Sequence, residues 1–178
     1  MKIKSILAVK IFILSLIFTQ QLNEKKISKK LLGFEQFLGK KYIGEFQNST
    51  KKKPLFDIIH FERILNGNAI CISHSVNDGE YGGKTVIIWN AKTGNLESYY
   101  FSTGGEIIQA IVTVEDSKIV MIEDFTENNN GIKKVKKIYK ISDNRTLENQ
   151  IKYLLNNIWV NSHEMVYIES DTVKIIFQ

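Results

Sequence analysis

The side chains of this sequence that are most suggestive of chemistry flank the dipeptide Asn66-Gly67. Asn-Gly between two apolar runs is typical of a two-residue hairpin turn, because both positions favour positive φ. Such a turn pairs Arg63 with Ile70, and Ile59 with His74, on one face of the hairpin. Arg63 and His74 are therefore predicted to be the polar exceptions on an apolar face.

A guanidinium inside a folded domain needs a partner, because an unpaired buried charge is costly. One candidate partner is the carboxylate or phosphate of a ligand, and the other is Asp57, which shares the face. We predict a ligand site in which Arg63 and His74 hold the polar end, with the Arg63–Asp57 pair as the open alternative. The side chains predicted to line the apolar part of this site are Ile59, Phe61, Ile72, Trp89 and Phe101.

The opposite hairpin face carries His60, Glu62, Cys71, Ser73 and Ser75, which could form a Cys–His or Ser–His nucleophile site with a carboxylate orienting the base. The sequence offers no Gly-x-Ser-x-Gly elbow and no His-Glu-x-x-His motif to support such a site. A solvated outer face explains these residues more simply. The chain is predicted not to be an enzyme, with a hydrolase or isomerase as an alternative.

The stretch Gly82-Gly-Lys-Thr85 resembles the end of a phosphate-binding loop. A P-loop needs a glycine where this chain has Asp78, and it needs a helix directly afterwards. The residues that follow, Thr85 to Asn90, are β-branched and aromatic and predict a strand instead. These glycines are therefore assigned to a turn between strands.

From residue 41 onward the chain alternates apolar and polar positions in short runs divided by Gly, Asn and Asp, which predicts consecutive antiparallel strands. Closure removes the free edges of such a sheet, and the short connections favour an up-and-down barrel over a sandwich. We predict an all-β fold, a single antiparallel β-barrel of about ten strands. Leu31, Leu32, Phe34 and Phe37, at roughly helical spacing, predict a short helix before it, with Ser28 as its cap. The predicted strands are 41–47, 55–65, 68–77, 84–90, 96–103, 106–114, 118–125, 132–142, 146–155 and 159–169, with a closing segment at 173–177.

The first residues differ from the rest, since Lys2, Lys4 and Lys10 precede the apolar run 11–18. This layout is typical of a secretory signal peptide, and the run is shorter than a membrane span. We predict a signal peptide at 1–20, a linker and short helix at 21–40, and the barrel domain at 41–178. An uncleaved N-terminal anchor is the alternative. The predicted location is secreted or periplasmic.

The net charge of +5 includes the three leader lysines, and the 21 Lys and Arg that remain exceed the 19 Asp and Glu by two. This balance, with basic runs at 25–30 and 51–53 that lack interleaved aromatic residues, excludes nucleic acid as the expected partner. With one cysteine, Cys71, no internal disulfide can form, so the core alone must stabilise a secreted fold. Cys71 is predicted to be a buried thiol. Abundant Lys, Ile and Asn with one Pro are typical of an AT-rich bacterial genome.

The segment Leu38-Gly-Lys-Lys-Tyr-Ile-Gly-Glu-Phe46 resembles the start of calycin-type barrels: lipocalins, fatty-acid-binding proteins and nitrobindins. Gly39, Tyr42, Gly44 and Glu45 stand where these families have a glycine, a tryptophan that closes the barrel floor and, in nitrobindins, Gly-Glu. This chain has Tyr in place of Trp and one additional residue before it. The mature chain is also similar to uncharacterised secreted bacterial proteins of that superfamily.

The resemblance implies a barrel that binds a small apolar or amphipathic molecule in its interior. Nitrobindins hold haem through a histidine on a late strand, and His163 is the residue that could match it. No cofactor is predicted, with haem at His163 as an alternative. The remaining alternative is an envelope or extracellular protein-interaction barrel with a filled core. The ligand and the oligomeric state are not specified by the sequence.

Overall fold

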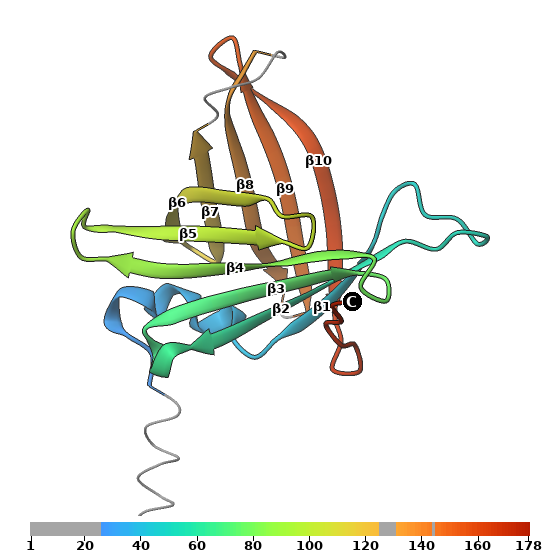
Figure 1. Cartoon of the computed structure of the whole chain (residues 1–178), viewed down its shortest axis with the longest axis horizontal. Coiled ribbons are helices and arrows are strands. Elements are labelled where there is room, and N and C mark those ends of the chain that lie inside the picture. The colour runs from blue at the N-terminus through green and yellow to red at the C-terminus, as the bar shows by residue number, and fades with distance from the viewer. Residues whose placement is uncertain (1–25, 125–130, 144) are drawn as a thin grey trace, which may run out of the picture.

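Ten antiparallel strands form a closed barrel in the computed structural model, which describes residues 26–124, 131–143 and 145–178 (Figure 1). Each strand pairs with its neighbours in sequence, and β1 pairs with β10 to close the barrel. The predicted all-β, up-and-down barrel is confirmed. Its strands are β1 (Lys41–Glu45), β2 (Phe56–Ile64), β3 (Ala69–Val76), β4 (Tyr81–Asn90), β5 (Asn95–Ser102), β6 (Ile107–Glu115), β7 (Lys118–Asp124), β8 (Ile132–Asp143), β9 (Thr146–Leu155) and β10 (Ile158–Glu169).

The hairpin around Asn66-Gly67 has the predicted register. Arg63 pairs with Ile70, and Ile59 pairs with His74. Asn66 and Gly67 both have positive φ, 54° and 84°, as the Asn-Gly turn requires, and the turn contains the short 3₁₀ helix η2 (Leu65–Gly67). A two-residue turn leaves no freedom in pairing, so it fixes which side chains of β2 and β3 face the barrel interior.

The predicted N-terminal helix is the 3₁₀ helix η1 (Lys29–Phe37), which lies across one end of the barrel (Figure 1). Leu31, Phe34 and Phe37 are fully buried. Their spacing of three matches the three residues per turn of a 3₁₀ helix, so they form one straight apolar stripe. Ser28 precedes the helix, but its side chain makes no capping hydrogen bond, so the predicted cap is wrong.

An aromatic cluster joins this helix to the strands. The Phe61 ring centroid lies 5.4 Å from that of Phe37, 6.1 Å from that of Tyr42 and 5.7 Å from that of Tyr139. The two tyrosine rings meet Phe61 edge to face, a favourable arrangement of aromatic quadrupoles. The end of the barrel next to η1 is therefore filled with side chains.

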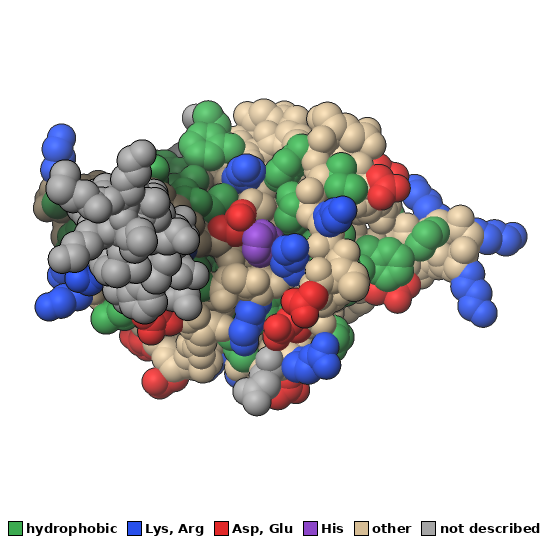
Figure 2. All heavy atoms as spheres, turned by 90° about the horizontal axis from the view of Figure 1, so that it is seen from below, with side chains coloured by type: hydrophobic (Ala, Val, Ile, Leu, Met, Phe, Trp, Pro, Cys, Tyr) green, Lys and Arg blue, Asp and Glu red, His purple; other side chains and the backbone are tan. Residues whose placement is uncertain are grey.

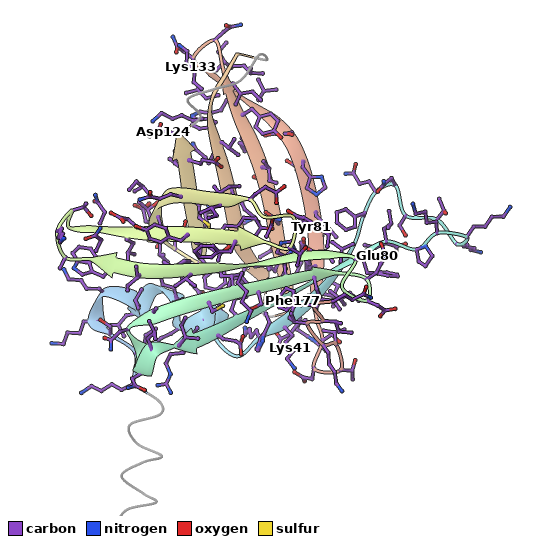
Figure 3. The ribbon with its side chains drawn as sticks, viewed as in Figure 1. Lys41, Glu80, Tyr81, Asp124, Lys133 and Phe177 are labelled. Carbon is purple, nitrogen blue, oxygen red and sulfur yellow. The ribbon has the colours of Figure 1, made fainter. Side chains whose placement is uncertain are left out.

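The C-terminal residues after β10 run along the outside of the barrel and form no strand, so the predicted closing segment at 173–177 is wrong. The Ile176 N–H donates to Ser75 Oγ at 3.2 Å, and Gln178 Nε2 donates to the Asp78 carbonyl at 2.9 Å. Phe177, labelled in Figure 3, lies beside Gly82 of β4, where an added Cβ would come within 3.1 Å of its ring. This tail buries Ser75, on a face expected to be solvated.

The signal peptide predicted at 1–20 lies outside the described residues. None of the described helices is both long enough and apolar enough to cross a membrane. Seen from below the barrel, cationic and anionic side chains are interspersed over the surface (Figure 2).

Candidate functional site

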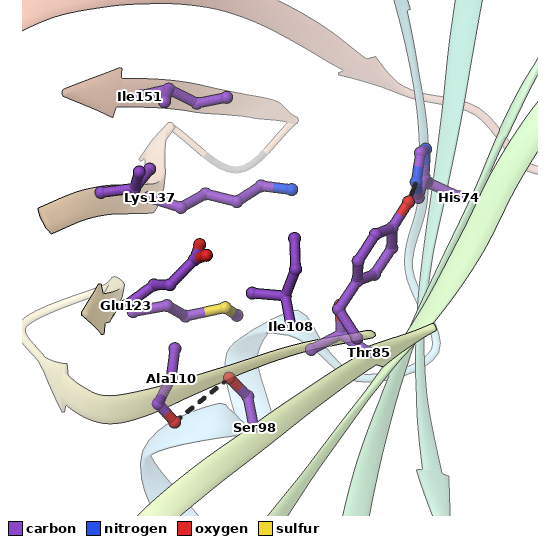
Figure 4. Close-up of a pocket in the computed structure, with 11 residues that line it drawn as sticks. His74, Thr85, Ser98, Ile108, Ala110, Glu123, Lys137 and Ile151 are labelled. Carbon is purple, nitrogen blue, oxygen red and sulfur yellow. Dashed lines mark hydrogen bonds between the residues drawn. The ribbon is translucent and has the colours of Figure 1, made fainter. Parts of the chain in front are cut away.

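A cavity of about 240 Å³ lies inside the barrel (Figure 4). Its wall is built from inward-facing positions of β3 to β9, because side chains alternate between the two faces of each strand. Apolar side chains predominate, and a few polar groups interrupt them. The lining residues are His74, Thr85, Ser98, Tyr100, Ile108, Ala110, Met121, Glu123, Val135, Lys137 and Ile151.

A chain of hydrogen bonds runs along one side of this cavity. Asp57 Oδ1 lies 3.1 Å from His74 Nδ1, and His74 Nε2 lies 3.0 Å from the Tyr100 hydroxyl. Tyr167 donates its hydroxyl to Asp57 Oδ2 at 2.8 Å, and the hydroxyls of Tyr100 and Tyr81 are 3.1 Å apart. Two of the five members, His74 and Tyr100, reach the cavity wall.

The carboxylate of Asp57 determines the directions in this chain when His74 is neutral. An ionised carboxylate only accepts hydrogen bonds, so Nδ1 of His74 carries the proton and Nε2 accepts from Tyr100. Burial raises the pKa of Tyr167 and, together with the hydrogen bond to Tyr81, that of Tyr100. Both phenols therefore remain protonated donors over the physiological pH range.

Gly83 makes room for Tyr100 in this arrangement. It pairs with His74 across the β3–β4 ladder, and a Cβ at this position would lie 2.4 Å from Tyr100 Cε2. The rings of His74 and Tyr100 stack with their centroids 5.8 Å apart. The glycine that resembled part of a phosphate-binding loop thus lies within β4 and packs against a tyrosine.

Lys137 supplies a cation on the other side of the cavity, with its side chain extended towards His74 (Figure 4). Burial opposes its charge, but the charge of Tyr139, the hydrogen bond to Tyr139 and the charge of Asp57 outweigh burial and raise the pKa of Lys137. Lys137 Nζ lies 5.0 Å from the centroid of the Tyr139 ring. Within the described residues no ion pair includes Lys137. An ammonium group that stays charged in a mainly apolar cavity is a ready partner for an anion.

Glu123 lines the same cavity from β7, one strand away from Lys137. Burial raises the pKa of this carboxyl. A carboxyl that is more easily protonated repels an approaching anion less than an ordinary glutamate would. The polar groups of the cavity therefore combine one persistent cation with phenol, imidazole and carboxyl groups that can form hydrogen bonds.

The prediction that Arg63 and His74 share a site is wrong. Arg63 Nη1 donates to the Lys26 carbonyl at 3.1 Å, near the closed end of the barrel. His74 pairs with Ile59, four residues along β2 from Arg63, which is roughly 13 Å at the rise of a strand. Asp57 takes His74, not Arg63, as its internal partner. The cavity cation is Lys137 instead.

The predicted apolar lining residues are also placed elsewhere. Ile59, Phe61 and Ile72 belong to the buried core but not to the cavity wall. Trp89 lies under Lys30, whose Nζ is 4.1 Å from the ring centroid. Phe101 is 47% exposed, so its predicted interior position is wrong. Three consecutive aromatic residues, 99–101, obscure the alternation there, and Tyr100 takes the inward position.

Sequence reasoning missed Lys137, Glu123 and Tyr100. A signal for Lys137 existed, since Val135, Lys137 and Tyr139 have the same strand parity. Lys136 and Lys140, which lie on the other face of the strand, obscure that alternation.

The alternative nucleophile site separates into two pairs. His60 Nδ1 lies 3.4 Å from Glu62 Oε2, and Cys71 Sγ lies 3.6 Å from Ser73 Oγ. Burial lowers the pKa of His60 despite the opposing effect of Glu62. Cys71 is buried, as predicted. These four side chains do not line the interior cavity, because they face the other side of the sheet.

His163 does not line the cavity. A β-bulge in β10 between Asn161 and His163 turns His163 to the interior, where its ring centroid is 6.3 Å from that of Phe46, and leaves Trp159 on the other face. Both ring nitrogens of the cavity histidine, His74, are already hydrogen bonded. The described residues contain no cluster of three potential metal ligands. These residues do not fit a haem.

No protein-family model matches the chain, and no curated protein does. A crystal structure of Rv2717c from M. tuberculosis is similar, with a TM-score of 0.49, 11% sequence identity, and coverage of 82% of this chain and 99% of that chain.

Proposed function

We propose that this barrel binds a small, mainly apolar ligand with one anionic end in its interior cavity. The single observation that carries the proposal is the charged ammonium of Lys137, without an ion pair among the described residues, in a cavity with mostly apolar walls. Charge-assisted hydrogen bonds to such a group contribute about 1.5–3 kcal/mol. The apolar wall contributes by removing the rest of the ligand from water.

The size of the cavity limits the ligand. At about 240 Å³ it is smaller than the roughly 300–1,000 Å³ of pockets for drug-sized molecules. It has the volume of roughly eight water molecules. We infer a ligand with one small ring or a short chain, such as an aromatic or aliphatic monocarboxylate.

We also propose that the protein is a secreted bacterial binding protein of the lipocalin type. The basic and apolar pattern of residues 1–20 supports export, and the segment 38–46 supports the calycin relationship. Binding requires no turnover, so we propose a carrier or sensor instead of an enzyme.

Native mass spectrometry of the protein purified without detergent provides the first test. We expect excess mass that disappears on denaturation, or appears after incubation with benzoate. Benzyl alcohol, which has the same ring and no charge, should bind less tightly. Lys137→Met should weaken benzoate binding about 10- to 100-fold and leave benzyl alcohol binding nearly unchanged.

A matched pair of variants on β6 separates the interior from the surface. Ala110→Phe should fill the cavity and abolish binding of both compounds, because Ala110 lines it. Ile111→Phe, one residue along and 44% exposed on the other face, should bind as the wild type does. If Ala110→Phe folds and still binds benzoate, the interior site is wrong. If no compound binds the wild type, the filled interaction barrel replaces this proposal.

A further inference from the structure

Lysines face one another across the strands on the outer surface of β7, β8 and β9. Lys118 of β7 is directly opposite Lys140 of β8, and Lys136 of β8 is directly opposite Lys152 of β9. Like charges at directly opposed positions destabilise a sheet. The two pairs should therefore lower the stability of the folded protein, and the strand pairing alone gives no reason for them.

Only part of this positive charge is compensated within the chain. Lys140 Nζ lies 3.3 Å from Glu148 Oε2, and Lys136 Nζ lies 4.0 Å from the centroid of the Trp159 ring. Lys118 and Lys152 take part in no ion pair among the described residues. Among the described residues, Lys118, Lys136 and Lys152 therefore keep a charge without a carboxylate partner, and Lys136 lies over the Trp159 ring instead.

Lys118 and Lys152 line one groove, of about 300 Å³, on the outer face of the sheet. Its lining residues are Lys118, Ile138, Lys140, Glu148, Gln150 and Lys152. Glu148 accepts hydrogen bonds from Ser142 Oγ at 2.6 Å and from Lys140, and the Ser142 hydrogen bond lowers its pKa. Since Glu148 is already engaged, three ammonium groups surround a space with a single satisfied carboxylate.

We propose that this groove binds a phosphate-type oxyanion with more than one negative charge, such as a diphosphate group. Lys118 and Lys152 would contact its oxygens from opposite sides, and the Gln150 amide would donate a further hydrogen bond. The bound anion would replace the repulsion within both lysine pairs by attraction. The site is separate from the interior cavity, because its residues occupy the outward positions of the same strands.

The test uses the full chain and the variants Lys118→Gln and Lys152→Gln, with Lys92→Gln in an exposed turn as the matched control. Inorganic diphosphate at ten times its dissociation constant should raise the melting temperature of the wild type by about 3–6 °C over chloride of equal ionic strength. Each groove variant should weaken diphosphate binding at least tenfold. Lys92→Gln should leave binding unchanged.

The melting temperature without diphosphate is a second readout, and here the groove variants should be more stable than the wild type. Without diphosphate and at low salt, Lys118→Gln and Lys152→Gln should melt at a higher temperature than the wild type, because each removes one repulsive pair. The melting temperatures test the repulsion between the paired lysines, and the diphosphate affinity tests the site. If the wild type and the groove variants bind diphosphate with equal affinity, the site does not exist.

Lipid vesicles show whether the phosphate group belongs to a lipid headgroup or to a soluble ligand. If vesicles containing phosphatidic acid, whose phosphomonoester carries up to two negative charges, bind the wild type but not either groove variant, and soluble diphosphate has no effect, the phosphate belongs to a lipid headgroup. If diphosphate binds with the expected dependence on the variants, the phosphate belongs to a soluble ligand. If neither shows dependence on Lys118 or Lys152, the proposal is overturned. Benzoate binding in the interior should be the same in all these variants.

Discussion

Two tyrosine hydroxyls inside the barrel differ in what surrounds them. Tyr167 donates to Asp57 at 2.8 Å. The buried hydroxyl of Tyr42 has no hydrogen-bond partner among the described residues. A buried polar group without a partner loses its hydration and gains nothing in return. The same chemical group therefore stabilises the barrel at one position and destabilises it at the other.

Removing each hydroxyl should consequently change stability in opposite directions. Tyr42→Phe should raise the free energy of unfolding by about 1 kcal/mol, and Tyr167→Phe should lower it by about 1–3 kcal/mol, since it leaves Asp57 with one partner fewer. Urea denaturation of the two variants measures both effects. Equal losses in the two variants would show that the Tyr42 hydroxyl is satisfied.

The stability of the protein at alkaline pH should also depend on the hydroxyl of Tyr42. Burial, followed by the negative charge of Glu169, raises the pKa of Tyr42 to about 12 from its ordinary value near 10. A group whose pKa is raised by folding contributes stability below its unfolded pKa, and that contribution is lost as pH rises from about 10 through 12. In Tyr42→Phe the decline of stability over this interval should be shallower than in the wild type.

The candidate site was only partly predictable at this scale. His74 was identified because the Asn-Gly turn fixes its register and parity reports the face of a strand. Alternation along a strand shows which face a side chain lies on, but not its position along the barrel axis. Arg63 was therefore assigned to the same site as His74, although it lies near the closed end of the barrel. Lys137 was missed because alternation is hard to recognise where lysines occupy both faces.

Among the elements, η1 contributes to the core out of proportion to its length. Phe34→Ala should lower the free energy of unfolding by about 3–5 kcal/mol, because the fully buried ring leaves a cavity at the end of the barrel. Leu32→Ala, in the same helix and 47% exposed, should cost much less. Guanidinium denaturation of the pair measures the difference. Similar costs would mean that η1 does not close the barrel.

The strands were predicted more accurately than the helix and the bulge. Period-two alternation bounded by turn residues placed all ten strands, since each signal is local in the sequence. The bulge before His163 inserts one residue, and its position depends on the partner strand. Parity alone would therefore place His163 and Trp159 on the same face, whereas the structure places them on opposite faces. The helix type depends on which of Leu31 and Leu32 faces the core, and this is decided by packing.

At the scale of the whole molecule, closure of the barrel depends on a close contact between β1 and β10. Gly44 lies in β1, and a Cβ there would come within 2.8 Å of Tyr167 Cδ1 and 2.9 Å of Met165 Cε. Gly44→Ala should therefore cost about 1–3 kcal/mol by overpacking. It should mainly accelerate unfolding, because we expect this contact to form after the transition state.

Stopped-flow refolding and unfolding of Gly44→Ala check this expectation. Gly104→Ala is the matched control, because its added Cβ would meet only the flexible side chain of Glu106, at 3.0 Å. A slower refolding rate in Gly44→Ala with unchanged unfolding would place closure before the transition state instead.

The pairing of β1 with β10 also determines when, during synthesis of the chain, the barrel can close. The hydrogen bond from Tyr167 to Asp57 joins residues 110 positions apart, and β1 meets its second neighbour only through residues 167–169. Until residues 167–169 have left the ribosome, β1 and the most recent strand present two unpaired edges, and unpaired edges can pair with another chain. The barrel can therefore close only after β10 has been synthesised, and a chain that stops before β10 keeps both edges open.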